Sequence, residues 1–210
     1  MAQDPDMTAR SLARPRRVTI HPLIVRLCHW INAAAMIVMI LSGWAIHNAD
    51  PIAPFLFPGR ITLGGGLIGG LQWHFAAMWV LFVNGILYLV YGFASGRFAR
   101  KLRPISVRDA VVDGLAALRG RLGHADLSVY NGVQRLLYAG VIALAVLVVA
   151  SGLSIWKPVQ FGWLTWLFGD FDVARIVHFA AMSGIVLFLV VHVAMSLLVP
   201  RSLLAMIRGA

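Results

Sequence analysis

Two histidines lie in the last long apolar stretch of the chain, ARIVHFAAMSGIVLFLVVHVAMSLLVP, which covers residues 174–200. His178 and His192 are fourteen residues apart. In an α-helix this separation falls only about 40° short of four full turns, so both side chains project from one face, about 21 Å apart along the axis. One helix face therefore offers imidazole nitrogens at two depths, and imidazole is a common ligand of iron, copper and zinc.

The stretches that carry histidines are long enough to cross a membrane. The chain has 210 residues, of which 60% are hydrophobic and 12% charged, whereas soluble domains are about 25% charged. Four apolar runs, at 22–46, 71–94, 130–156 and 173–200, each reach the roughly 20 residues that a membrane-spanning helix needs. We predict an all-α membrane protein, a four-transmembrane-helix bundle over 22–200 with a loop at 95–129 and tails at 1–21 and 201–210. The sequence shows no convincing internal repeat.

The basic residues indicate how this bundle is oriented. The chain has 18 Lys and Arg against 8 Asp and Glu, a formal net charge of +10. Most of the cations lie before the first apolar run, between the second and third, and after the fourth. The positive-inside rule then places the N- and C-termini and the middle loop in the cytoplasm. We therefore predict a multi-pass protein of the bacterial inner (cytoplasmic) membrane, with lipid and not nucleic acid around its basic segments.

Depth in the membrane pairs the four histidines that lie inside the apolar runs. In this orientation His29 starts the first span on the cytoplasmic side, at the depth of His192. His74 starts the second span on the periplasmic side, at the depth of His178. Haem iron takes two axial ligands, and imidazole suits it. Two histidine pairs stacked across a membrane are what two bis-histidine haems require.

Glycines and arginines near these histidines fit the same interpretation. Gly43 lies fourteen residues after His29, and Gly85 lies eleven after His74. Each faces the side of its histidine at the level of the other haem, where a missing side chain would let a porphyrin come close. Ordinary packing of small residues between helices is the alternative explanation.

Two cations precede proposed ligands by three residues, one helical turn. Arg26 precedes His29, and Arg175 precedes His178. Each is a candidate partner for haem propionates, although Arg26 could also serve only the positive-inside bias.

Other roles are open to histidines inside a membrane. They can form hydrogen bonds between helices or act as a proton relay in a small transporter. The sequence has no C-x-x-C-H motif for covalent c-type haem, and its one cysteine, Cys28, can form no internal disulfide. Four histidines at two matched depths favour haem over these alternatives.

The sequence also resembles a known superfamily of di-haem cytochrome b subunits. The motifs are HPLIVRLCHWINA (21–33), with its R-x-x-H-W, and ARIVHFAAMSGIVLFLVVHV (174–193), with two histidines fourteen apart. They are similar to those of prokaryotic cytochrome b-561, formate dehydrogenase gamma and nickel–iron hydrogenase b-type cytochromes. The resemblance is greatest to the thiosulfate reductase-type subunits that partner periplasmic molybdopterin oxidoreductases. It implies two haem b groups, with ligands that map onto the histidines already identified, His29, His74, His178 and His192.

The resemblance further implies a quinone site near the cytoplasmic haem. In YNGVQRLLY, at the start of the third span, Asn131 and Gln134 lie three residues apart on one helix face, where each could bond a quinone carbonyl. Polar residues at a helix start are the alternative reading. We expect an electron-transfer subunit, not a complete enzyme, which moves electrons between quinone and a periplasmic oxidoreductase.

Three other functions remain open at this point. The chain could be a stand-alone quinone-linked oxidoreductase that acts on superoxide or ferric iron, a proton-coupled transporter, or an anchor that binds haem only for assembly. The partner's substrate and the direction of electron flow are not encoded visibly.

Overall fold

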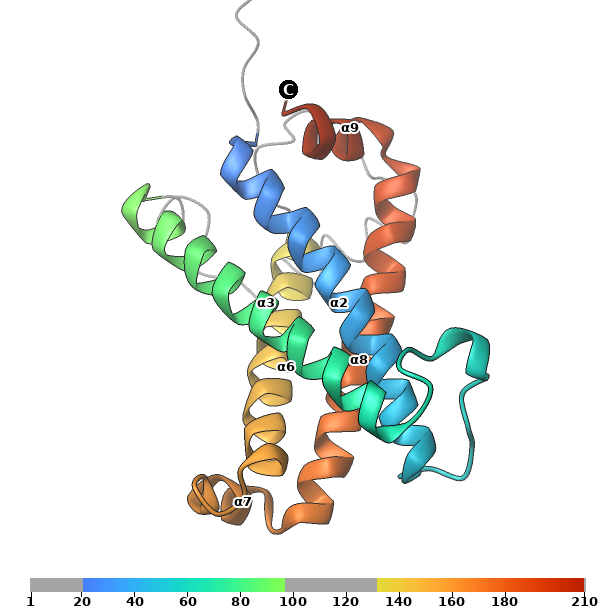
Figure 1. Ribbon diagram of the computed structural model, residues 1–210. Helices are drawn as coiled ribbons and strands as arrows, with labels where there is room; N and C mark the ends of the chain where they lie inside the picture. The colour runs from blue at the N-terminus through green and yellow to red at the C-terminus, as the bar shows by residue number, and fades with distance from the viewer. Residues whose placement is uncertain (1–20, 97–131, 210) are drawn as a thin grey trace, which may run out of the picture.

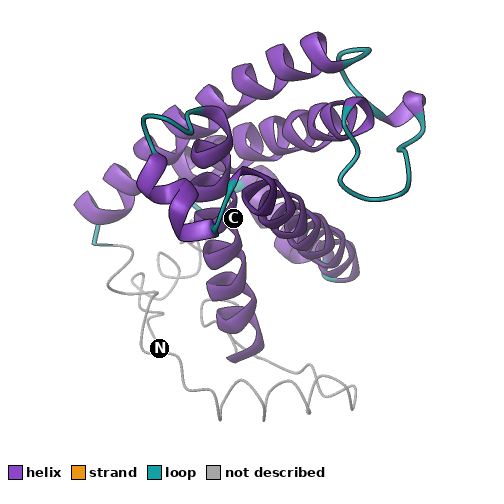
Figure 2. Cartoon of the chain, turned by 90° about the horizontal axis from the view of Figure 1, so that it is seen from below, coloured by secondary structure: helices purple, strands orange, loops and turns teal. Residues whose placement is uncertain are grey.

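Four long helices make up most of the protein. The computed structural model describes residues 21–96 and 132–209. The long helices are α2 (Leu23–Ala49), α3 (Leu67–Ala94), α6 (Gly132–Trp156) and α8 (Phe171–Leu198), shown in Figure 1. Each contains a stretch long and apolar enough to cross a membrane. The described ranges hold helices and connecting loops but no strand (Figure 2). The predicted all-α, four-helix membrane architecture is confirmed.

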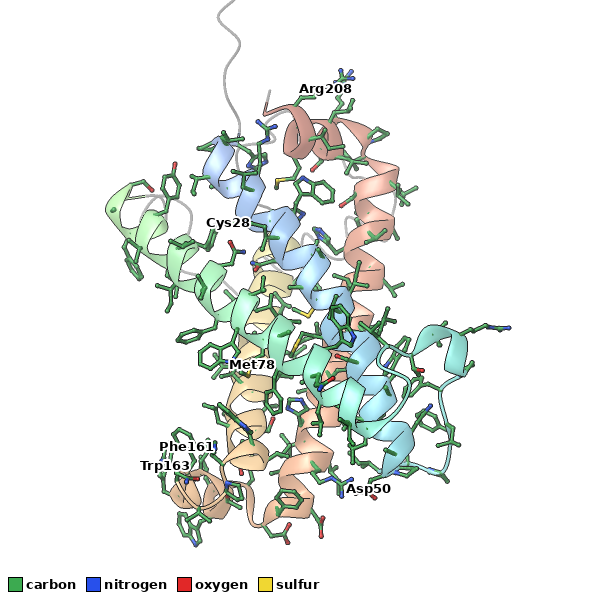
Figure 3. All side chains as sticks on the ribbon, in the orientation of Figure 1. Cys28, Asp50, Met78, Phe161, Trp163 and Arg208 are labelled. Atoms are coloured by element: carbon green, nitrogen blue, oxygen red, sulfur yellow. The ribbon has the colours of Figure 1, made fainter. Side chains whose placement is uncertain are left out.

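Shorter helices mark the two ends of the bundle. The predicted C-terminal tail forms α9 (Pro200–Arg208), which starts with a proline at its first turn. This helix lies beside the start of α2, whereas α7 (Gly162–Phe168) lies at the opposite end (Figure 1). We call these the α9 end and the α7 end. In Figure 3, Arg208 and Cys28 lie toward the α9 end, and Asp50 and Trp163 lie toward the α7 end.

The long helices form two hairpins. Helix α2 packs closely on α3, and α6 packs closely on α8, whereas the backbones of different hairpins approach each other much less. The chain turns into α3, the second helix of the first hairpin, at a run of glycines. Gly64 and Gly65 have φ angles of +106° and +69°, a backbone conformation that favours glycine. Gly70 then lies against Ala45 and Ile46, so α3 can begin close to the end of α2.

The loop after α2 is fixed by polar side chains at the end of that helix. His47 Nε2 lies 3.1 Å from the Phe55 carbonyl oxygen, to which it donates. Asn48 bonds both the N–H and the C=O of Phe57, each at 2.8 Å. The short helix η1 (Gly59–Ile61) follows in the same loop. These bonds hold residues 50–58 against the α7 end, where the ring of His47 also stacks on Phe179 of α8.

A buried amide links α2 and α3 in the apolar interior. Asn84, 4% exposed, donates to the carbonyl oxygen of Cys28 at 2.8 Å and to Asn32 Oδ1 at 2.6 Å. A hydrogen bond between helices in an apolar environment fixes their register, because a shifted helix would leave the amide without a partner.

We expect Asn84→Ala to destabilise the protein by about 1 kcal/mol, the size of interhelical hydrogen bonds in membrane proteins. The free energy of unfolding in a detergent titration measures the effect. Ser183→Ala is the control, because Ser183 Oγ bonds only the carbonyl of its own helix at Phe179. Equal stability of Asn84→Ala and Ser183→Ala would show that the amide does not link the helices.

Candidate functional site

The structure brings the four histidines together in two pairs, both between hairpins. The ring centroids of His29 on α2 and His192 on α8 are 6.1 Å apart. Those of His74 on α3 and His178 on α8 are 6.4 Å apart. Helix α8 thus contributes one imidazole to each pair, fourteen residues apart, as its periodicity predicts.

The separation within each pair fits one metal ion between two imidazoles. Two trans imidazoles on one iron, each with a metal–nitrogen bond of about 2 Å, place their ring centroids roughly 6 Å apart. Both observed separations, 6.1 Å and 6.4 Å, match this geometry. Two imidazoles make too small a ligand set for a closed non-haem centre, which needs four or more ligands. Within residues 21–96 and 132–209 no group of three or more His, Cys, Asp or Glu side chains comes together, so a porphyrin suits the donor set.

The hydrogen bonds of the second pair leave the right nitrogen for a metal. His178 Nδ1 lies 3.0 Å from the carbonyl oxygen of Val148, which can only accept, so Nδ1 carries the hydrogen. His74 Nδ1 lies 3.1 Å from Ser42 Oγ. The Ser42 hydroxyl donates to the Val38 carbonyl at 2.6 Å, so it accepts from His74. Both imidazoles therefore keep an unprotonated Nε2, which is the usual arrangement of a metal-binding histidine.

The first pair has apolar surroundings. The ring of His192 stacks on Phe188 with centroids 5.8 Å apart, and the ring of His29 meets Trp30 edge-on at 5.3 Å. Among the contacts of the described residues, neither imidazole makes a hydrogen bond. The two pairs thus have similar distances between ring centroids, but only the rings of His74 and His178 are held by hydrogen bonds.

The predicted glycines differ in their surroundings. A Cβ atom on Gly43 would lie 3.6 Å from Cε1 of His74, so Gly43 is indeed at the level of the other histidine pair. A Cβ atom on Gly85 would meet nothing within 4 Å. Sequence reasoning missed Gly152 of α6, whose Cβ would lie only 3.1 Å from Cε1 of His178. Their predicted roles beside a porphyrin remain predictions.

The two arginines bond protein oxygens in this structure. Arg26 donates to the carbonyl of Met206 at 3.3 Å and to that of Ile207, and so caps the C-terminal end of α9. Arg175 forms an ion pair with Asp50 at 2.7 Å and thereby joins α8 to the end of α2. Their predicted pairing with propionates stays a prediction, and it would require these contacts to be exchanged or shared.

The proposed quinone residues are only partly covered by the structure. Asn131 lies outside the described residues. Gln134 is the third residue of α6. The quinone site therefore stays a prediction from the resemblance.

Comparison with known proteins identifies a family. The family model described as "Prokaryotic cytochrome b561" matches residues 20–209. A protein of Azospira oryzae named "Putative protein-methionine-sulfoxide reductase subunit YedZ1" is 53% identical over 190 residues, which are 90% of this chain and 96% of that protein.

More distant relatives carry a different name. A "Probable Ni/Fe-hydrogenase B-type cytochrome subunit" of Bradyrhizobium diazoefficiens is 23% identical, over 88% of this chain and 79% of that protein. One of the same name from Cupriavidus necator is 25% identical, over 80% and 74%.

Proposed function

This chain belongs to the prokaryotic cytochrome b561 family of haem-binding membrane electron-transfer proteins, and from that premise we propose a more specific role. It carries electrons across the bacterial inner membrane between the quinone pool and a periplasmic oxidoreductase. Two haem b groups serve as the carriers, one at His29 and His192 and one at His74 and His178.

The observation that carries this proposal is that four imidazoles form two pairs at haem-compatible separations, and that α8 contributes one imidazole to each pair. When bound, haem supplies one-electron transfer at an iron atom. The chain's own part is to bind and orient. Helix α8 would supply one imidazole to each haem, His178 to one and His192 to the other, at levels about 21 Å apart, so the two sites would lie in series along the membrane normal. The helices that carry these histidines are apolar along their length, which would limit the access of water to both sites.

The orientation of the bundle follows from the positive-inside rule. The α9 end, with Arg201 and Arg208, lies on the cytoplasmic side, and the α7 end lies on the periplasmic side. Quinone then reacts near the His29–His192 pair, with Asn131 and Gln134 as candidate partners of its carbonyl groups. The periplasmic oxidoreductase docks at the α7 end, near the His74–His178 pair.

The relatives' names support a protein partner. The 53% identical relative is named "Putative protein-methionine-sulfoxide reductase subunit YedZ1". We therefore propose that this chain passes electrons outward from quinol to a periplasmic reductase of that class, of molybdopterin type. Methionine sulfoxide accepts two electrons and two protons to give methionine and water, so each turnover draws two one-electron transfers through the chain. The relatives named for hydrogenase indicate that one scaffold serves partners of different chemistry.

Quinol-driven reduction of the purified protein tests the proposal. We expect two b-type haems per chain by haem assay, and a reduced-minus-oxidised visible spectrum of b type after addition of a quinol. In vesicles, oxidation from the outer face should require the co-purified periplasmic reductase and its methionine sulfoxide substrate. Absence of haem in reconstituted protein would instead favour the proton-relay transporter. Rapid oxidation by superoxide or ferric iron without any partner would favour the stand-alone enzyme.

A further inference from the structure

The two hairpins share a local arrangement that the proposed function does not use. In each hairpin, a serine followed by a glycine on the first helix meets a histidine on the second. Ser42 and Gly43 of α2 meet His74, and Ser151 and Gly152 of α6 meet His178. Both serines are 0% exposed. We call the two contacts the serine cradles.

The two cradles have nearly the same geometry. Each hydroxyl oxygen lies 2.6 Å from the carbonyl oxygen four residues earlier in its helix, that of Val38 or Leu147. It lies 3.2 Å from the carbonyl three residues earlier, that of Met39 or Val148. A hydroxyl has one hydrogen, and the shorter contact takes it. Each serine oxygen is therefore left as an acceptor.

The imidazoles supply the hydrogens that these oxygens accept. His74 Nδ1 lies 3.1 Å from Ser42 Oγ, and His178 Nδ1 lies 3.2 Å from Ser151 Oγ. His178 Nδ1 has a second acceptor, the carbonyl oxygen of Val148 at 3.0 Å, three residues before Ser151. The Nδ1–H of His178 is thus shared between a hydroxyl and a carbonyl, and the Nδ1–H of His74 is donated to the Ser42 hydroxyl. A ring held at two acceptors has little freedom to rotate.

The two histidines thus held belong to one pair, although they come from different hairpins. The imidazoles of His29 and His192, which form the other pair, contact aromatic rings but make no hydrogen bond among the described residues. The cradles therefore distinguish the two sites.

We propose that Ser42 and Ser151 are positioning residues that lower the reduction potential of the haem at His74 and His178. The inference rests on the proposed function. A hydrogen bond accepted from Nδ1–H raises the basicity of the ligating nitrogen. A more basic ligand stabilises the more positively charged, oxidised metal, so reduction becomes less favourable. The haem at His29 and His192 would not be affected in this way, because neither of those imidazoles donates to a serine.

Potentiometric titration of Ser42→Ala and Ser151→Ala tests the inference. Each variant keeps both histidines of the pair, so we expect haem content to stay at the parent level. The reduction equilibrium of one haem should shift toward the reduced form by a factor of up to about ten, which is about 59 mV for a one-electron couple. The other haem should be unchanged, and the double variant should shift further.

Two further variants make the test specific. Ser154→Ala removes another fully buried hydroxyl of α6, one that bonds Thr165 and no histidine, and it should leave both potentials unchanged. Ser42→Cys keeps the shape but offers a weaker acceptor, so it should give an intermediate shift even if the alanine variant binds haem poorly. The electron paramagnetic resonance signal of the oxidised haem should change only in the Ser42 and Ser151 variants.

The outcomes separate this inference from the proposed function. A parent protein with two haems, and serine variants whose potentials equal those of Ser154→Ala, would overturn the role of the cradles and leave the proposed function intact. A parent protein without haem would overturn both. A shift toward the oxidised form would contradict the argument from ligand basicity.

Discussion

His178→Ala should remove one haem and spare the other, and His192→Ala should remove the other one. Both residues lie on α8, but each belongs to a different pair. Removal of either imidazole would leave its site with one histidine where two would hold the haem. We expect haem content to fall from about two to about one per chain in each variant, measured by haem assay and by the visible difference spectrum.

The partners of these residues should reproduce the same two spectra. His74→Ala should match His178→Ala, and His29→Ala should match His192→Ala. His47→Ala is the control, because His47 is also a buried histidine, 4% exposed, but bonds the loop after α2 and belongs to neither pair. It should keep both haems.

One pattern of loss would refute the pairing. If His29→Ala and His74→Ala removed the same spectral component, with helical content and chain size unchanged, the four histidines would not form two sites in series. In the expected case, every one of the four variants stops electron transfer across the vesicle membrane, because a series pathway fails when either carrier is missing.

Helical periodicity explains why the sequence predicts the pairing so well. Positions along a straight apolar helix have depths and directions fixed by 1.5 Å and 100° per residue. The membrane also limits how far antiparallel helices can slide. His178 and His192 could therefore be matched with His74 and His29 before any packing was known.

Contacts that depend on close approach of two helices could not be predicted in this way. The bonds from Ser42 to His74 and from Ser151 to His178 require the exact crossing of each hairpin. The Ser-Gly dipeptide in both first helices was the available signal, but two residues are too short to stand out as a repeat.

Residues at the bundle ends were the hardest to assign from sequence. The sequence puts Arg26 one turn before His29, but it does not predict α9, the helix whose carbonyls Arg26 bonds. Arg175 likewise has a carboxylate partner, Asp50, that is distant in the sequence. A long, flexible arginine side chain can reach several oxygen atoms near a helix end, and helical periodicity does not predict which of them it bonds.

Gly152→Ala should lower haem content at the His74–His178 pair much more than Gly43→Ala. A methyl group at Gly152 would lie 3.1 Å from Cε1 and 3.4 Å from Nδ1 of His178, so the ring or the helix must move. At Gly43 the corresponding distances to His74 are 3.6 Å and 3.8 Å, which are ordinary van der Waals contacts. A haem assay measures the fall in bound haem, and a titration with added haem measures the affinity. If the contact costs about 1.4 kcal/mol of binding free energy, the affinity for haem falls about tenfold.

The direction of this effect separates haem binding from folding. Alanine is more favourable than glycine inside a helix by about 1 kcal/mol, so Gly152→Ala should not weaken α6 itself. Gly140→Ala, in the same helix and with nothing within 4 Å of the added methyl group, is the matched control and should bind haem as the parent does. If Gly152→Ala and Gly140→Ala bound haem equally, the close approach of α6 to His178 would have no role at the site. If only Gly152→Ala loses the haem, with helical content intact, then the absence of a side chain at Gly152 determines the position of the His178 ring. The hydrogen bond with Ser151 then determines the orientation of that ring.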